Sequence, residues 1–372
     1  MASVCLNMIV KNEAPTIRKC LESVRPLVDT WVIVDTGSTD GTQEVIRDCF
    51  KDFPGELHER EWKGFDGSRS EAIELARGSA DYLLFIDADD EMRIRPGFRM
   101  PELTLDAYNI ALHDGPVVHW RMALVATRLP WRYEGVLHEY ITCDAPHSTG
   151  TLEGAHILTV GGGARLRDEG KREKYLRDAE ILAKALVEEP DNARYAFYLA
   201  QSWRDAEEPE KALAAYDRRA EMAGWVEETY CAKLYAARLA VQLKRPAGEL
   251  IDRYLRAYES RPSRIEAIGD LARLCRLEGR WPLAHLFAAR AAGIPRPEDI
   301  LFVEMSWHEW RALDELAVAS YWIGDYEKSR EYCTRLLDGG KVPEGERARI
   351  AANLEFAQGK SATSAPVAPT PA

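Results

Sequence analysis

The sequence contains no apolar run of the about 18 residues that a membrane-spanning helix needs. Its first residues, MASVCLNMIVKNEAP, lack the basic segment of a secretory signal peptide, and Lys11 and Glu13 interrupt the apolar stretch early. Basic residues are also scarce, because 49 Lys and Arg face 61 Asp and Glu, for a formal net charge of −12. An acidic balance argues against a nucleic-acid or anionic-membrane binder. We therefore expect no membrane span and no nucleic-acid partner.

Paired cysteines are missing as well. The chain has seven cysteines, an odd number, and none of them forms a C-x-x-C pair. This pattern argues against a disulfide framework or a zinc site and predicts reduced thiols in the cytoplasm. Apolar residues make up 46% of the chain and charged residues 30%, which is typical of a globular protein, and 372 residues are enough for two domains.

The first 165 residues alternate short β-rich runs with amphipathic stretches. The pattern predicts strands at 4–10, 31–35, 55–61 and 82–87, and helices at 13–28, 38–50 and 68–78. Alternating β and α units build a mostly parallel sheet with helices on both faces. In such sheets ligands bind at the carboxyl ends of the strands, near the point where the strand order reverses.

From residue 166 to 360 the pattern becomes helix after helix. Short helix pairs recur: LAQSW at 199–203 and LARLC at 271–275 lie 72 residues apart, or two periods of about 36, close to a tetratricopeptide repeat. The next copy, LAVAS at 316–320, follows after a longer step, which predicts an insertion at 294–307. Such pairs stack on their neighbours and leave a concave surface. Residues 361–372 are rich in Ser, Pro and Ala and predict a disordered tail.

The stretch YLLFIDADDEM, residues 82–92, places four acids directly after a buried strand. One such acid can simply cap the next turn. Asp87 and Asp89 alternate, however, so on an extended backbone both carboxylates would point to the same face. Like charges that close are unfavourable unless a cation lies between them. A hard divalent cation, held by one or two carboxylates and by substrate phosphates, would fit this pattern.

Polar residues also follow the first two predicted strands: Asn12 and Glu13 come after one, and Asp35 ends the other. The blocks NMIVKNEAPTIRKCLESV, WVIVDTGSTDGT and YLLFIDADDE resemble the signature blocks of inverting family 2 glycosyltransferases. With the helical repeats behind them, the chain resembles bacterial members of that family that carry tetratricopeptide repeats. The resemblance implies an α/β domain of the GT-A (Rossmann-like) fold at 1–165, followed by an all-α helical-repeat domain at 166–360.

The resemblance also implies a donor site for a nucleotide-sugar, with a UDP-linked donor favoured. Glu13 and Asp35 would hold the nucleoside, with Asn12 at the same edge of the sheet. Asp87 and Ala88 would lie near the ribose and the diphosphate.

In the same family pattern, Asp89 would bind the Mn²⁺ or Mg²⁺ that bridges the phosphates. Relatives often carry an Arg-Asn pair before the third helix. Here Arg69 matches but Ser70 replaces the Asn, so only Arg69 is carried over.

Sugar transfer needs a base that takes the acceptor's proton. The segment WRYEGVLHEYI, residues 131–141, contains a G-x-x-H-E block similar to one in the relatives. We assign Glu139 as the base and His138 as a metal or phosphate ligand; Glu134 and Asp114 are the alternatives for the base. These residues also fit a simpler interpretation, in which the acids are on the surface and the histidine is packed in a strand.

The segment VGGGARLRDEGKREK, residues 160–174, joins the two halves. It fits a flexible linker, or a lid whose Arg165 and Arg167 close on the diphosphate. Because only about 75 residues follow Glu91 in the first half, short for this fold, we expect the repeats to complete the acceptor site or to recognise the acceptor. The acceptor would be a peptide side chain, a small molecule or a glycan. A homodimer formed through the repeats is consistent with this organisation, although no residue points to it.

The leading hypothesis is therefore a metal-dependent inverting glycosyltransferase of the hexosyltransferase type. The competing hypothesis is a helical-repeat binding scaffold whose nucleotide-sugar domain is inactive, but a dead domain would be expected to lose at least one of the acids. A nucleotidyltransferase ranks last, because its Gly-rich basic loop near the N-terminus is missing.

Overall fold

The computed structural model describes residues 2–115, 117–161, 163 and 170–363. The chain divides into two compact units. The first is Met1–Ala215 with Ile300–Phe302, and the second is Tyr216–Asp299 with Val303–Ala372. The change from strands to helices occurs between Thr159 and Lys171, so the first unit combines the α/β part with the first helices of the helical part.

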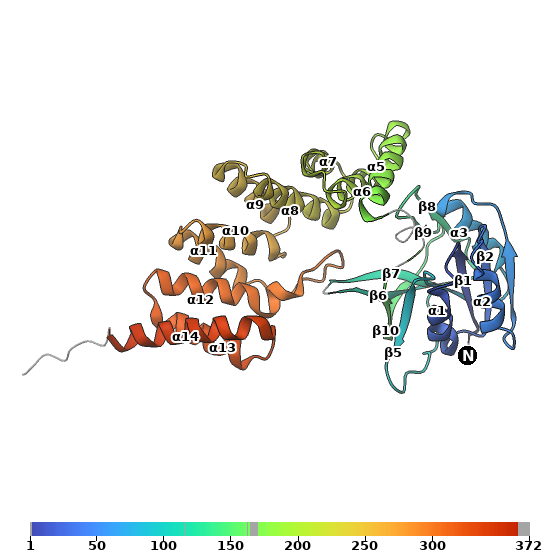
Figure 1. Cartoon of the computed structure of the whole chain (residues 1–372), viewed down its shortest axis with the longest axis horizontal. Helices are drawn as coiled ribbons and strands as arrows, with labels where there is room; N and C mark the ends of the chain where they lie inside the picture. The colour runs from blue at the N-terminus through green and yellow to red at the C-terminus, as the bar shows by residue number, and fades with distance from the viewer. Residues whose placement is uncertain (1, 116, 162, 164–169, 364–372) are drawn as a thin grey trace, which may run out of the picture. The chain divides into compact units, whose positions relative to one another are not determined.

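The first unit contains an eight-stranded mixed sheet in the order β3-β2-β1-β4-β7-β6-β10-β5 among the described residues (Figure 1). Its strands are β1 (Val4–Val10), β2 (Thr30–Asp35), β3 (Gly55–Glu59), β4 (Tyr82–Phe85), β5 (Asp90–Ile94), β6 (Ala107–Asp114), β7 (Val117–Ala126) and β10 (Thr149–Thr159). β1 pairs in parallel with β2 and β4, and β2 pairs in parallel with β3. The four strands expected from the sequence are thus confirmed as a parallel set. β7 pairs antiparallel with β4 and begins the mixed half of the sheet.

Helices and a small hairpin complete this unit. They are α1 (Ile17–Val24), the 3₁₀ turn η1 (Arg25–Leu27), α2 (Thr42–Cys49), α3 (Gly64–Leu75), the hairpin of β8 (Arg132–Glu134) and β9 (Tyr140–Thr142), α5 (Lys171–Glu188), α6 (Ala193–Asp205) and the start of α7 (Pro209–Glu221). The helix expected at 13–28 is shorter than predicted, because the chain turns before Ile17 and Pro26 lies in the 3₁₀ turn at its end.

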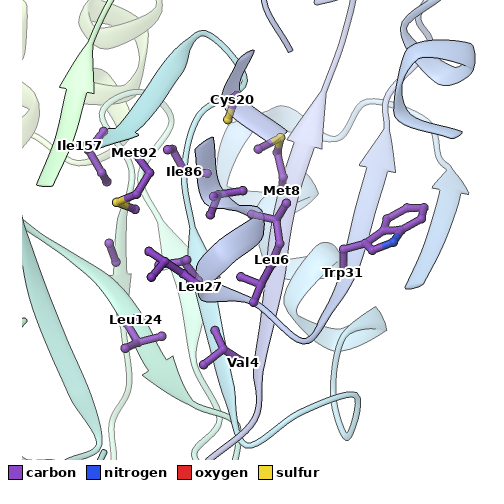
Figure 2. Close-up of a cluster of buried hydrophobic side chains, with 14 of the residues drawn as sticks. Val4, Leu6, Met8, Cys20, Leu27, Trp31, Ile86, Met92, Leu124 and Ile157 are labelled. Carbon is purple, nitrogen blue, oxygen red and sulfur yellow. The ribbon is translucent and has the colours of Figure 1, made fainter. Parts of the chain in front are cut away.

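The parallel strands are buried on both faces. Val4, Leu6 and Met8 of β1 point into one apolar cluster, which α1 and α2 also line, and Figure 2 shows part of this cluster. Cys5, the residue between Val4 and Leu6, instead belongs to a second cluster, together with Ile73 of α3. Because alternate residues of these strands are buried on opposite faces, most positions are apolar, and the strands appear in the sequence as almost unbroken apolar runs.

The strand order reverses at β1, since β2 and β3 lie on one side of it and β4 on the other. A reversal of this kind opens a crevice at the carboxyl ends of the two central strands. The residues that follow β1, β2 and β4 are therefore placed around one edge of the sheet.

The second unit is a stack of helices in which consecutive helices pack against each other from α8 to α14. They are α8 (Val226–Gln242), α9 (Ala247–Ser260), α10 (Glu266–Leu277), α11 (Trp281–Ala292), the π-helical turn η2 (Trp307–Arg311), α12 (Ala312–Trp322), α13 (Tyr326–Asp338) and α14 (Glu344–Thr363). The expected fold class, α/β followed by all-α helix pairs, is confirmed. The predicted insertion lies between α11 and η2.

One expectation about a chain segment changes in part, and another stays a prediction. α14 continues to Thr363, so the first residues of the expected disordered tail are helical, and residues 364–372 lie outside the described residues. Arg165 and Arg167, the two arginines of the lid hypothesis, also lie outside them. Among the helices that the structure describes, none combines the length and the apolarity that crossing a membrane requires.

Candidate active site

Asp35 ends β2 with its side chain almost completely buried, at 1% exposure. Its Oδ1 atom accepts hydrogen bonds from the backbone N–H groups of Gly37, at 2.8 Å, and Ser38, at 2.7 Å. Its Oδ2 atom is buried and has no hydrogen-bond partner among the described residues. Buried carboxylate oxygens are almost always paired, so this atom fits a donor supplied by a ligand.

The loop after β1 is tied to the loop after β2. Asn12 has a φ of +57°, which is uncommon for a residue other than glycine. Its backbone N–H donates to Ser38 Oγ at 2.8 Å, and its Oδ1 accepts from the Thr39 backbone at 2.9 Å. Asn12 and Glu13 thus lie at the same edge of the sheet as Asp35, as the sequence predicts.

Asp87 lies just beyond β4 and is held by two arginines. Arg69 of α3 donates to its Oδ1 at 2.5 Å, and Arg121 of β7 donates to its Oδ2 at 2.8 Å. Burial by itself raises the pKa of Asp87, but the two guanidinium groups outweigh burial and hold that pKa well below its ordinary value. Asp87 is therefore a fixed negative charge.

The expectation that Asp87 and Asp89 point to the same face is wrong. β4 ends at Phe85 and the chain then turns, with the Asp90 backbone N–H donating to the Asp87 carbonyl at 3.0 Å. The turn, which contains the buried Ala88, removes the strand alternation on which the expectation depended. Asp89 instead accepts a hydrogen bond from the backbone of Gly163 at 3.0 Å.

Asp89 meets Glu13 rather than Asp87. A methyl group placed on Gly163 would lie 2.6 Å from Asp89 Oδ2 and 3.3 Å from Glu13 Oε1. Two carboxylates therefore converge on one point, and only glycine leaves the space between them open. A third acid, Asp90, is buried nearby: burial, followed by the charge of Asp87, raises the pKa of Asp90 to about 7, so this carboxyl group is only partly ionised at neutral pH.

The pair of Glu13 and Asp89 fits the expected metal. Among the described residues no group of three His, Cys, Asp or Glu side chains is placed to hold a metal ion. Mg²⁺, however, is commonly held by one or two carboxylates together with substrate phosphates and water. Two converging carboxylates match that requirement.

Glu139 joins this site through Arg69. Its Oε1 atom accepts a hydrogen bond from Arg69 Nε at 2.6 Å, so one guanidinium connects Glu139 with Asp87. The ring of Tyr133 lies 5.5 Å from the same guanidinium, and burial raises the pKa of Tyr133 to about 12. The structure therefore brings Arg69, Asp87 and Glu139 together.

The two alternative bases lie elsewhere. Glu134 accepts from Arg132 at 2.5 Å and from the Tyr140 hydroxyl at 3.0 Å, which ties it to the β8–β9 hairpin. Asp114 is exposed at the end of β6. His138 is not packed in a strand: its ring stacks on Tyr198 of α6, with ring centres 3.9 Å apart and ring planes 7° apart.

Arg121 and Gly163 are site residues that sequence reasoning missed. The signal for Arg121 was a single arginine inside the otherwise apolar stretch WRMALVA at 120–126. A charged residue in a buried strand usually has a partner. Gly163 gave no comparable signal, because it lies in a run of three glycines.

The comparisons with known proteins agree with this geometry. Residues 5–95 match the family model described as "Glycosyl transferase family 2". This segment is similar to glycosyl transferase family 2. The matched segment contains Glu13, Asp35 and Asp89, whereas Arg121 and Glu139 lie beyond it.

Two curated relatives share parts of the chain. A TPR repeat-containing protein of Synechococcus elongatus is 31% identical over 150 residues, which are 38% of this chain and 36% of the relative. The prophage-derived glycosyltransferase SunS of Bacillus subtilis is 35% identical over 89 residues, which are 24% of this chain and 20% of the relative. The matches thus span well under half the length of these relatives.

A tetratricopeptide repeat protein from Parabacteroides merdae is among the solved structures that match the chain, at 18% identity and a TM-score of 0.39, and the match covers 53% of this chain and 71% of that one.

Proposed function

We propose that this protein transfers a sugar from a nucleotide-sugar to an acceptor, with a UDP-linked donor, a divalent metal ion and inversion at the anomeric carbon. The main support is the placement of Asp35, Glu13 and Asp89 at the carboxyl ends of parallel strands, inside the segment that matches family 2. Each acid has a distinct environment, and each environment suits one part of such a donor.

Asp35 would bind the nucleoside. Its buried Oδ2 atom needs a hydrogen-bond donor, and a uracil N–H or a ribose hydroxyl supplies one. A UDP-linked donor predicts a higher affinity for UDP than for GDP.

Glu13 and Asp89 would hold the metal ion, which neutralises the developing charge of the leaving diphosphate when it is bound. The two carboxylates already converge on Gly163. Arg69 and Arg121 balance the charges of Asp87 and Glu139, so the negative charge that favours a cation here comes from Glu13 and Asp89.

Glu139 is the base in this proposal. One of its oxygens is fixed by Arg69, and none of the described residues donates a hydrogen bond to the other. The free oxygen would take the proton of the acceptor as the acceptor's nucleophilic atom bonds to the anomeric carbon. The bond from that carbon to the diphosphate breaks on the opposite face, and the nucleoside diphosphate leaves.

The acceptor is the least constrained part of the proposal. SunS is named as a glycosyltransferase, and the Synechococcus protein is named for its TPR repeats. Helical repeats present concave surfaces that bind peptides or other ligands. We propose that the helical unit helps to recognise the acceptor, which is a peptide side chain, a small molecule or a glycan.

Calorimetry with UDP and GDP, each with and without Mn²⁺, tests the donor site on wild type and Asp89→Asn. We expect UDP to bind more tightly with Mn²⁺ and Asp89→Asn to lose that gain. Asp48→Asn is the matched control, because Asp48 is 62% exposed and, among the described residues, forms an ion pair only with Arg18. Absence of any nucleotide binding would contradict the proposal and favour a binding scaffold.

Turnover tests the base. Glu139→Gln should lower kcat by roughly 100- to 10,000-fold, the range expected for loss of a general base. It should largely preserve UDP binding, because the hydrogen bonds described for Asp35 and Asp89 do not involve Glu139. A Glu139→Gln variant with wild-type turnover would remove Glu139 from this role.

A further inference from the structure

Helix α6 contacts the turn that carries Glu139. The turn runs from Gly135 to Tyr140, and three of its alternate residues contact α6. The Tyr195 hydroxyl accepts a hydrogen bond from the Val136 backbone at 3.3 Å. Arg194 donates two hydrogen bonds to the His138 carbonyl, at 3.2 and 2.7 Å.

Aromatic rings add further contacts between α6 and the turn. The His138 ring stacks on Tyr198 with centres 3.9 Å apart. The guanidinium of Arg194 lies 4.8 Å from the ring of Tyr140 and 4.9 Å from the ring of Tyr198. Cation–π contacts of this kind are attractive. We refer to the three α6 residues Arg194, Tyr195 and Tyr198 as the α6 clamp.

The turn has an unusual backbone conformation. His138 has a φ of +52°, in a region that residues with side chains rarely adopt. Gly135 has a φ of +117°, and a methyl group placed on it would lie 3.3 Å from the Glu139 Cα atom. Strained backbone persists only where surrounding contacts hold it, and such positions cluster at active sites.

Glu139 lies between two residues that contact α6, whereas its own side chain contacts a different helix, α3. Its neighbours His138 and Tyr140 contact α6, whereas its own carboxylate accepts from Arg69 of α3 at 2.6 Å. The turn is therefore held from both sides, by α3 through the Glu139 side chain and by α6 through the neighbouring residues.

We propose that the α6 clamp positions Glu139 for catalysis, so that Tyr198 and Arg194 are positioning residues of the transferase. The inference rests on the proposed function, because it assigns the clamp to the base of that reaction. It gives the first helices after the sheet a role in the chemistry and not only in acceptor recognition. A displacement of about 1 Å at a catalytic group can cost about 100-fold in rate.

The kinetic test compares three variants of α6 in the full chain. Tyr198→Ala removes the stack on His138, and Tyr198→Phe keeps the ring. Trp203→Ala is the matched control, because Trp203 is an aromatic residue of the same helix whose ring contacts Lys211 at 4.6 Å. UDP release from UDP-glucose, UDP-galactose and UDP-N-acetylglucosamine with Mn²⁺ gives kcat and the donor KM, with water or an added acceptor as nucleophile.

The expected result is a fall in kcat of about 10- to 100-fold for Tyr198→Ala, with the donor KM changed by no more than about twofold. Tyr198→Phe and Trp203→Ala should keep wild-type kcat. The inference is overturned if Tyr198→Ala keeps kcat within about twofold of wild type, or if Trp203→Ala loses as much as Tyr198→Ala.

Hydrogen exchange tests the clamp without relying on turnover. In Tyr198→Ala the amides of residues 135–141 should exchange faster than in wild type, while those of β1 stay protected. Unchanged exchange in the turn would overturn the inference. If wild type releases no UDP from any donor, the proposed function fails, and the exchange result still decides whether the clamp holds the turn.

Discussion

Replacing Arg264 by methionine should strongly destabilise the helical unit. Arg264 is completely buried and donates to both oxygens of Glu266, at 3.0 and 2.8 Å. It also reaches Asp299 at 3.4 Å, and its guanidinium lies 4.7 Å from the Tyr230 ring. Glu266 is equally buried, so Arg264→Met would leave a buried carboxylate without its cation.

The magnitude follows from that burial. Removing one partner of a buried ion pair typically costs about 3–5 kcal/mol, because the remaining charge stays uncompensated. The same free energy lowers hydrogen-exchange protection by roughly 100- to 4000-fold. Glu266 keeps a hydrogen bond from the Tyr230 hydroxyl and one from the Glu304 backbone, which places the expected cost toward the lower end of this range.

Hydrogen exchange of α8 and α10 is the suitable assay, since it reports the local stability of one unit in a chain with two. Arg264→Met/Glu266→Leu should recover part of the loss, because an apolar pair can replace a buried ion pair at little cost, whereas the Tyr230 hydroxyl and the Glu304 N–H lose their acceptor. Arg256→Met is the control: Arg256 is 69% exposed and pairs with Asp252 on the surface, so the change should be below about 1 kcal/mol.

The stability that Arg264→Met loses should also depend on pH. Burial by itself raises the pKa of Glu266, but Arg264 holds that pKa below its ordinary value of 4.5. In wild type the pair therefore stabilises the fold above pH 4.5, and this contribution is lost as the pH falls through the lowered pKa. Without Arg264, burial favours the neutral form of Glu266. The difference in stability between Arg264→Met and wild type should therefore narrow at low pH. A gap that widens below pH 4.5, or wild-type protection in Arg264→Met, would refute the reasoning.

Two further predictions concern the candidate active site. Arg121→Met removes one of the two cations on Asp87, so it should raise the Asp87 pKa and weaken Mn²⁺-dependent UDP binding in calorimetry; unchanged binding would show that Arg121 is dispensable there. Gly163→Ala should push the Asp89 carboxylate aside, because the new methyl group would lie 2.6 Å from Oδ2, and it should lower the Mn²⁺-dependent UDP affinity at least about tenfold. Gly248→Ala, in open space on α9, is its control, and equal affinities in both variants would contradict the prediction.

The sequence alone determined the elements and the edge of the sheet at which the site lies. Apolar runs defined β1, β2 and β4, because strands buried on both faces need apolar residues at every position. The acids after those strands had to meet at one edge, since parallel strands share the direction of their carboxyl ends. Asn12, Asp35 and Asp87 were predicted at that edge for this reason.

Only the tertiary structure decided which acid meets which partner. Asp87 pairs with Arg69 and Arg121, 18 and 34 residues away, and Asp89 meets Gly163, 74 residues away. These pairings depend on burial and charge in the assembled fold, and no local periodicity encodes them. The turn after β4 shows the same limit, because the alternation that predicted a shared face for Asp87 and Asp89 applies only to an extended backbone.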